Sequence, residues 1–219
     1  LCTGNNGTFS LDPSGNGDFE TFAEAVDFLS CGVAGGNILI EVEPGTYNET
    51  VEIGSIFGAG PNATITFDGM SADSVTVSAS GGYVFSLEDV SYFTLKNMTI
   101  ENTSNGGGGI QASGMSHNNT FTDLYIDGST TGFSSSAWAI LVGDGTFSGN
   151  KDLSNFTITN NYMKEFYGGV HLYGGSNSSG DRGADNLVQN NEVEDMYYYG
   201  LYARNQIRME VYDNYFEYS

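Results

Sequence analysis

Short apolar segments, each interrupted by one Asn or Asp, recur along the second half of the chain. An apolar residue lies two positions before each polar residue, and another lies three positions after it. Asn and Asp tolerate a left-handed backbone and form local hydrogen bonds, so they suit a sharp bend between two half-buried strands. Spacings of 26, 37, 30 and 23 residues predict stacked repeats in which these residues align as a structural ladder. The ladder residues are Asn97, Asp123, Asn160, Asn190 and Asp213.

A third apolar segment follows each pair of strands. Its central residues, at spacings of 30, 30 and 31, are Ile110, Ile140, Val170 and Leu201. Three short strands per turn, joined by loops of variable length, predict an all-β fold, the right-handed parallel β-helix, which is a solenoid. An antiparallel sandwich is the alternative, but it does not predict the same three-part order in successive repeats.

The beginning of the chain has a helical pattern instead. Thr21 and Glu24 form a capping box ahead of an amphipathic segment. Because a solenoid must cover its terminal core, we expect a capping α-helix at about 21–30 within an N-terminal cap of residues 1–36. The β-helix then occupies 37–219. No polar cap follows its last strand, so we expect further chain or a stacked subunit at that end.

Composition narrows the range of partners. The 219 residues include 27 acidic and 6 basic ones, which gives a formal net charge of −21. This surface repels phosphate backbones and argues against nucleic-acid partners. No apolar run approaches membrane-spanning length, so no transmembrane segment is expected. Ca²⁺ is the one candidate cofactor: Asp144, Asp181 and Asp185 lie on loops, where weak Ca²⁺ binding or simple solvation is expected.

Cys2 and Cys31 are the only cysteines. An isolated pair near one end is typical of a single disulfide in an exported protein, and here it would pin the lead-in segment across the helix. Two unrelated reduced cysteines are the alternative. The disulfide favours a secreted or extracellular cell-surface location.

The most specific stretches of the sequence are DPSGNGDFETFAEAVDFL at 12–29 and ILIEVEPGTYNETVEI at 38–53. They resemble the N-terminal region of pectin-lyase-like right-handed β-helix proteins, including pectin methylesterases and secreted β-helix proteins of Bacteroidetes. The Cys2/Cys31 pair is most similar to the Bacteroidetes cell-surface group. The resemblance covers roughly residues 8–69 and implies the fold. The catalytic stretches of the methylesterases are absent from the sequence, so no esterase site is implied.

Strand alternation predicts two outward rows of side chains on the third strands. The rows are Gln111, Leu141, His171 and Tyr202, and Ser113, Gly143, Tyr173 and Arg204. Parallel neighbours lie about 4.8 Å apart, so the last two strands should bring His171, Tyr173, Tyr202 and Arg204 together in an exposed patch. Trp138 would border this patch.

The patch supports two interpretations. The glycan-binding residues would be Trp138, Tyr173, Tyr202 and Gln111. In a polysaccharide lyase, Arg204 or Arg182 would neutralise the uronate carboxylate, His171 would remove the proton, and Tyr202 would protonate the leaving oxygen. Pectin-lyase-like enzymes commonly carry their site on this sheet, which agrees with the resemblance. Few cations and no carboxylates on these rows favour a non-enzyme.

Three hypotheses of function follow. The leading one is a secreted or cell-surface module that acts in adhesion or surface structure and contacts polysaccharide. The second is a polysaccharide lyase that performs β-elimination on a uronate-containing glycan. The third is a structural spacer or filament subunit that stacks end to end. The expected partners are a polysaccharide or another cell-surface component, and further domains of the chain or a stacked subunit.

Overall fold

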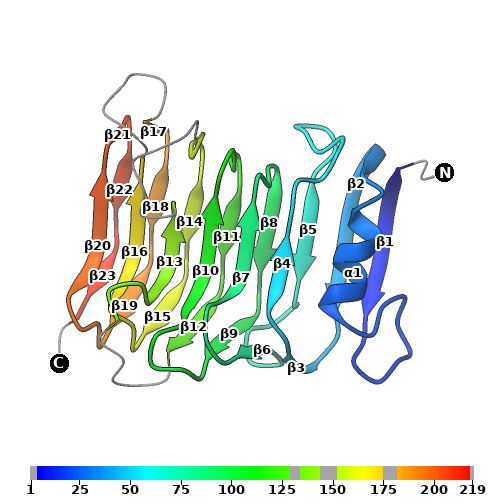
Figure 1. Ribbon diagram of the computed structural model, residues 1–219, viewed down its shortest axis with the longest axis horizontal. Helices are drawn as coiled ribbons and strands as arrows, with labels where there is room; N and C mark the ends of the chain where they lie inside the picture. Colours follow the sequence, from blue (N-terminus) through cyan, green and yellow to red (C-terminus); the bar gives the residue numbers. More distant parts are fainter. Residues whose placement is uncertain (1–3, 129–133, 144–151, 175–181, 218–219) are drawn as a thin grey trace.

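The computed structural model describes residues 4–128, 134–143, 152–174 and 182–217. Figure 1 shows short strands stacked side by side along the long axis, with one helix at the N-terminal end. Every pairing between the named strands of the described part is parallel. The parallel β-helix expected from the repeats is therefore confirmed.

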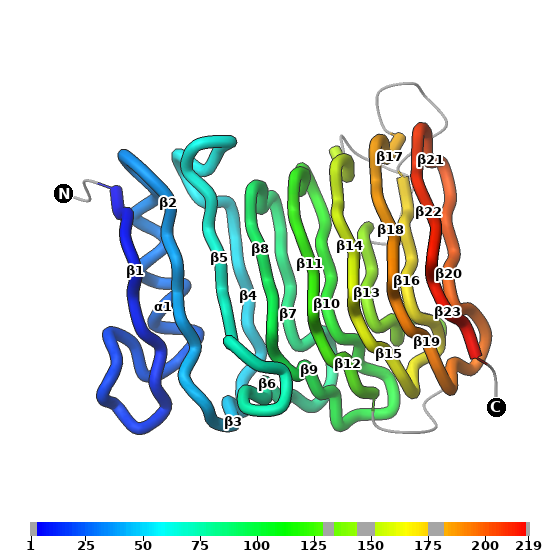
Figure 2. The backbone as a smooth tube through the Cα atoms, turned by 180° about the vertical axis from the view of Figure 1, so that it is seen from behind, coloured from blue at the N-terminus to red at the C-terminus, as the bar shows by residue number. Residues whose placement is uncertain are grey.

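Sheet A is the longest of the three main sheets. Its strands are β1 (Asn5–Leu11), β2 (Val33–Val42), β5 (Ile65–Asp68), β8 (Phe93–Lys96), β11 (Thr120–Thr122), β14 (Thr157–Thr159), β18 (Leu187–Gln189) and β22 (Glu210–Tyr212). The parallel stacking begins at β1, inside the segment 1–36 that we expected to serve as a cap. Figure 2 shows this sheet from behind, as one row from β1 to β22.

Sheets B and C complete each coil. Sheet B contains β3 (Gly45–Asn48), β6 (Val75–Ala79), β9 (Thr99–Asn102), β12 (Tyr125–Gly128), β15 (Tyr162–Lys164), β19 (Glu192–Glu194) and β23 (Tyr215–Phe216). Sheet C contains β4 (Val51–Ile53), β7 (Tyr83–Glu88), β10 (Gly108–Ser113), β13 (Trp138–Val142), β16 (Gly168–Tyr173) and β20 (Tyr199–Arg204). A short pair, β17 (Gly183–Ala184) and β21 (Gln206–Ile207), lies beside them. A regular coil thus takes one strand from each main sheet.

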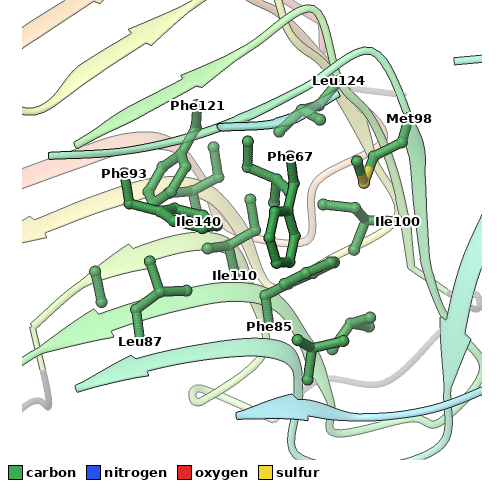
Figure 3. Packing of buried hydrophobic residues seen from close by; sticks show 14 of the residues in the cluster. Phe67, Phe85, Leu87, Phe93, Met98, Ile100, Ile110, Phe121, Leu124 and Ile140 are labelled. Carbon is green, nitrogen blue, oxygen red and sulfur yellow. The ribbon is translucent and has the colours of Figure 1, made fainter. Parts of the chain in front are cut away.

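The interior of the coil is apolar because alternate residues of all three sheets point inward. Figure 3 shows Phe67, Phe93 and Phe121 of sheet A meeting Phe85 and Ile110 of sheet C. These five side chains are fully buried, and the rings of Phe67 and Phe93 lie 5.3 Å apart. Each such burial contributes about 1.5–3 kcal/mol. The apolar core of stacked coils is therefore the main stabilising feature.

Helix α1 (Phe22–Leu29) forms where the capping box predicts it. The Thr21 hydroxyl accepts from the backbone of the first turn, and the Glu49 carboxylate accepts from two more of its N–H groups, at 2.9 and 3.1 Å. Phe22 is fully buried and packs edge-on against Phe85. Sheet C begins only at β4, so the helix takes the place of a strand in the first coil.

The five bend residues stack at the corner between sheets A and B. All have positive φ angles, between 53° and 58°, in the left-handed region that we expected. The sheet A strands that precede the bends pair with one another from coil to coil. The side chains of the bend residues themselves are exposed, except that of Asn97. Hence these side chains point away from the core rather than into it.

The side-chain ladder lies one residue later than the bend. The side-chain amide of Asn161 donates to Oδ1 of Asn191 at 3.0 Å, and the side-chain amide of Asn191 donates to Oδ1 of Asn214 at 2.9 Å. Asn161 and Asn191 are 2% exposed. The left-handed bend turns its own side chain outward and the next side chain inward. After the last three bends this next residue is an asparagine and forms the ladder, whereas after the first two it is an apolar core residue, Met98 or Leu124.

The disulfide stays a prediction, because Cys2 lies outside the described residues. The backbone N–H of Asn5 donates to the carbonyl of Gly32 at 3.0 Å, so the start of β1 lies beside the residue that follows Cys31. In the described part of the chain, no helix is long and apolar enough to cross a membrane.

Candidate functional site

One outward row of side chains crosses all six strands of sheet C. Register pairing joins each member to the next. The row consists of Glu52, Ser86, Gln111, Leu141, His171 and Tyr202. The last four were expected from the third-segment repeats. Glu52 and Ser86 were missed because β4 and β7 precede the regular repeats, although their own alternation carries the signal.

The C-terminal half of this row is aromatic. The ring of His171 lies 4.4 Å from that of Trp138, 4.9 Å from that of Tyr202 and 5.4 Å from that of Tyr173. The guanidinium carbon of Arg204 lies 5.9 Å from the Tyr173 ring centroid. The structure thus brings together the residues that alternation predicted.

Burial differs from the exposed patch that we expected. Trp138 is 4% exposed and Tyr173 is 5% exposed, so both serve mainly as packing residues. Both ring nitrogens of His171 are buried, and neither has a hydrogen-bond partner among the described residues. Burial lowers the pKa of His171 to about 4, because the charged imidazolium is poorly solvated there. The imidazole is therefore neutral near pH 7, weakly basic and shielded.

The two arginines named for the lyase mechanism are both exposed. Arg182 comes just before β17, and the N–H of the next residue, Gly183, donates to the carbonyl of Asn205 at 3.1 Å. Arg182 thus lies beside the segment that follows Arg204.

The proposed calcium ligands are only partly described. Asp144 and Asp181 lie outside the described residues. Asp185 forms a bidentate ion pair with Arg208, with both contacts at 2.6 Å. This hydrogen bonding lowers the pKa of the Asp185 carboxyl. Within the described segments, no group of three or more His, Cys, Asp or Glu side chains could hold a metal ion.

A group of tyrosines lies beside the aromatic half of the row, and only Tyr202 among them was expected from the sequence. We call it the tyrosine cluster; it consists of Tyr167, Tyr197, Tyr198, Tyr199 and Tyr202. Tyr197 and Tyr198 are 54% and 57% exposed. Tyr198 stacks on Tyr167 with centroids 5.8 Å apart, and Tyr199 stacks on Trp138 at the same distance. The signal in the sequence is the run of three tyrosines that ends at the first residue of β20.

The N-terminal half of the row is polar and open. It contains a groove of about 660 Å³, which we call the acidic groove, over β4, β7 and β10. Its polar side chains are Glu52, Ser86, Glu88, Gln111 and Ser113. Both glutamates are exposed. A volume of this size is typical of ligand sites.

Comparisons with known proteins define the class of fold. No family model matches the chain, and no curated protein matches it in sequence. The crystal structure of Escherichia coli ybhc matches with a TM-score of 0.59 and 17% identity, covering 97% of this chain and 66% of that one. This chain therefore spans just under two thirds of the length of ybhc. The pectin methylesterase from Aspergillus niger, in deglycosylated form, matches with a TM-score of 0.50 and 15% identity, covering 98% of this chain and 87% of that one.

These two matches agree with the parallel sheets described above. The chain has a right-handed parallel β-helix fold like that of these two proteins. At 15–17% identity the likeness shows the fold alone. The similarity to the Bacteroidetes cell-surface group stays a prediction.

Proposed function

We propose that this β-helix is a secreted or cell-surface module that acts in adhesion or surface structure and binds polysaccharide through the tyrosine cluster. The observation that carries the proposal is the pair of exposed rings, Tyr197 and Tyr198, next to three further tyrosines. A tyrosine offers an apolar ring face and a hydroxyl on one side chain. That combination matches the apolar C–H faces and the hydroxyls of sugars.

The cluster is also held in place before any ligand arrives. Trp138 is buried and stacks on Tyr199, and Tyr202 packs against both His171 and Tyr199. Side chains fixed by packing lose little conformational entropy on binding, which increases affinity.

Lyase chemistry fits the same face less well. A general base must come within hydrogen-bond distance of the proton that it removes. The ring nitrogens of His171 are buried, and the low pKa of this group makes it a weak base. The aromatic neighbours of His171 bury its ring nitrogens, which makes it a poor base. The same packing holds Tyr199 and Tyr202 in place for binding.

Affinity gel electrophoresis with a panel of soluble polysaccharides tests the proposal. We expect at least one glycan to retard the wild-type protein. The double variant Tyr197→Ala/Tyr198→Ala should lose most of this retardation, because aromatic residues dominate binding surfaces of this kind, at roughly 1–3 kcal/mol each.

The matched control is Tyr212→Ala/Tyr215→Ala, which removes two exposed tyrosines from sheets A and B. Its retardation should equal that of the wild type. Retardation by no glycan, or equal loss in both double variants, would contradict the proposal. An ultraviolet assay for unsaturated uronate product, with His171→Ala as control, tests the lyase alternative on the same panel.

A further inference from the structure

The acidic groove contains two carboxylates that the protein itself does not neutralise. Glu52 and Glu88 lie on adjacent strands, β4 and β7, and both are exposed. Register pairs Glu52 with Ser86 and Glu88 with Ser113, so the two carboxylates face the same side of the sheet. Within the described residues neither forms a side-chain hydrogen bond or an ion pair.

Among the described residues, the basic side chains lie away from this groove. None of the residues that line it is Lys or Arg. Lys96 pairs with an aspartate on sheet A at 2.7 Å, and Lys164 pairs with one on sheet B at 3.1 Å. Arg204 is on β20, the strand of sheet C farthest from β4. In a chain of net charge −21, with two exposed glutamates in its lining, the groove carries negative charge.

Neutral polar groups complete the lining. The side-chain amide nitrogen of Gln111 donates to the carbonyl of Gly143 at 3.1 Å, which fixes that side chain at the end of the groove. Ser86 lies between Glu52 and Gln111 in the row, and Ser113 on β10 lies beside Glu88, so each glutamate has a hydroxyl next to it. The groove thus combines negative charge with hydroxyl and amide groups that can bind sugar hydroxyls.

We propose that the acidic groove binds a polysaccharide with free amino groups, whose ammonium nitrogens contact Glu52 and Glu88. This inference rests on the proposed function and adds a second site with its own ligand class. Ammonium–carboxylate hydrogen bonds are stronger than neutral ones, and the negative potential steers a cationic chain toward the groove. A polyuronate is repelled by the same charges. A fully N-acetylated chain has no ammonium groups, so it forms no charge-assisted hydrogen bonds with the glutamates and is not steered toward the groove by its charge.

The test compares three soluble oligosaccharides of equal length by isothermal titration calorimetry. They are a glucosamine oligomer, its N-acetylated counterpart and an oligogalacturonate. We expect the glucosamine oligomer to bind at least about tenfold more tightly than the other two. The variant Glu52→Gln/Glu88→Gln should lose at least about tenfold in affinity, since it replaces charge-assisted hydrogen bonds with weaker neutral ones.

The matched control is Glu101→Gln/Glu210→Gln, which removes the same charge from sheets B and A. It should change the affinity by less than about twofold, because distant surface charges are screened by salt. Equal losses in the two double variants would show unspecific attraction of a polycation and overturn the inference. Equal affinity for the N-acetylated oligomer would overturn it too, as would equal affinity for the galacturonate, with or without added Ca²⁺.

The outcomes separate this inference from the proposed function. If Tyr197→Ala/Tyr198→Ala weakens glycan binding but Glu52→Gln/Glu88→Gln does not, the inference fails and the proposed function stands. If none of these glycans, nor any in the wider panel, binds the wild type, both fail.

Discussion

His171 shows how a single buried group can couple the aromatic half of sheet C to pH. Its ring lies among Trp138, Tyr173 and Tyr202, and burial lowers its pKa to about 4. In the unfolded chain the ordinary pKa is about 6.5. Between these values the unfolded state binds a proton that the folded state does not. The stability from neutral His171 is therefore full above about pH 6.5 and is lost as pH falls toward 4.

We expect the free energy of unfolding to decrease by roughly 1–2 kcal/mol more in the wild type than in His171→Phe between about pH 7 and 5. This range allows for partial solvent screening of the imidazole. Urea unfolding of both proteins at both pH values measures the difference. Phenylalanine keeps an aromatic ring in the cluster but does not titrate. Parallel decreases in the two proteins would show that His171 does not carry this dependence.

For single residues, the sequence predicted the row in which a side chain lies better than it predicted whether that side chain is buried. Alternation placed His171 and Tyr202 in one row and Tyr173 and Arg204 in the next, and the strand register agrees. It could not predict that Trp138 and Tyr173 are buried, because burial depends on what packs over a strand from elsewhere in the chain.

At the scale of elements, the buried asparagine ladder ties successive coils together. Asn191 accepts from the backbone N–H and the side-chain amide of Asn161, and it donates to the carbonyl of Ile158 and to Asn214. Buried amide networks of this kind are costly to interrupt, because each partner then lacks a hydrogen bond in a low-dielectric interior.

Asn191→Ala should therefore destabilise the protein by roughly 2–4 kcal/mol. The matched control is Asn190→Gly, which replaces an exposed residue at φ 53° with the residue that best accepts this angle. It should change stability by less than about 0.5 kcal/mol. Thermal and urea unfolding compare the two variants with the wild type. A loss of similar size in both would mean that the amide bonds of the ladder contribute little.

The bends could be predicted because left-handed backbone strongly favours Asn and Asp. Predicting the ladder also requires knowing which residue at each bend points into the core. The polar doublets Asn160-Asn161, Asn190-Asn191 and Asp213-Asn214 were visible in the sequence. Only the geometry of the corner decides which member of each doublet points inward. The helix was easier to place, since the capping box and the apolar stripe of α1 are both local signals.

At the scale of the whole molecule, the two ends of the coil differ. Helix α1 packs over the core at the N-terminal end, whereas at the other end the outermost strands of sheets A and B are β22 and β23. Val211 on β22 and Phe216 on β23 are exposed apolar residues. Unpaired strand edges and apolar side chains together favour association.

We predict that a protein of residues 1–219 self-associates through this end at high salt, where the repulsion between chains of net charge −21 is screened. Val211→Lys should reduce the association, because it places a charge on the apolar end of the coil. Tyr212→Lys, which changes the next residue on β22, should not. Size-exclusion chromatography with light scattering across protein concentrations measures the effect. A monomer at every concentration would argue against stacking.

The outward row of sheet C has a consequence for how such a protein can change over time. Each coil contributes one side chain to the row, while the inward neighbours of that side chain supply the core. An exchange at Glu52 or Gln111 alters what the surface offers and leaves the interior contacts as they were. Mutation can therefore change the recognition surface one strand at a time. A new binding specificity can then arise by single substitutions that do not destabilise the fold.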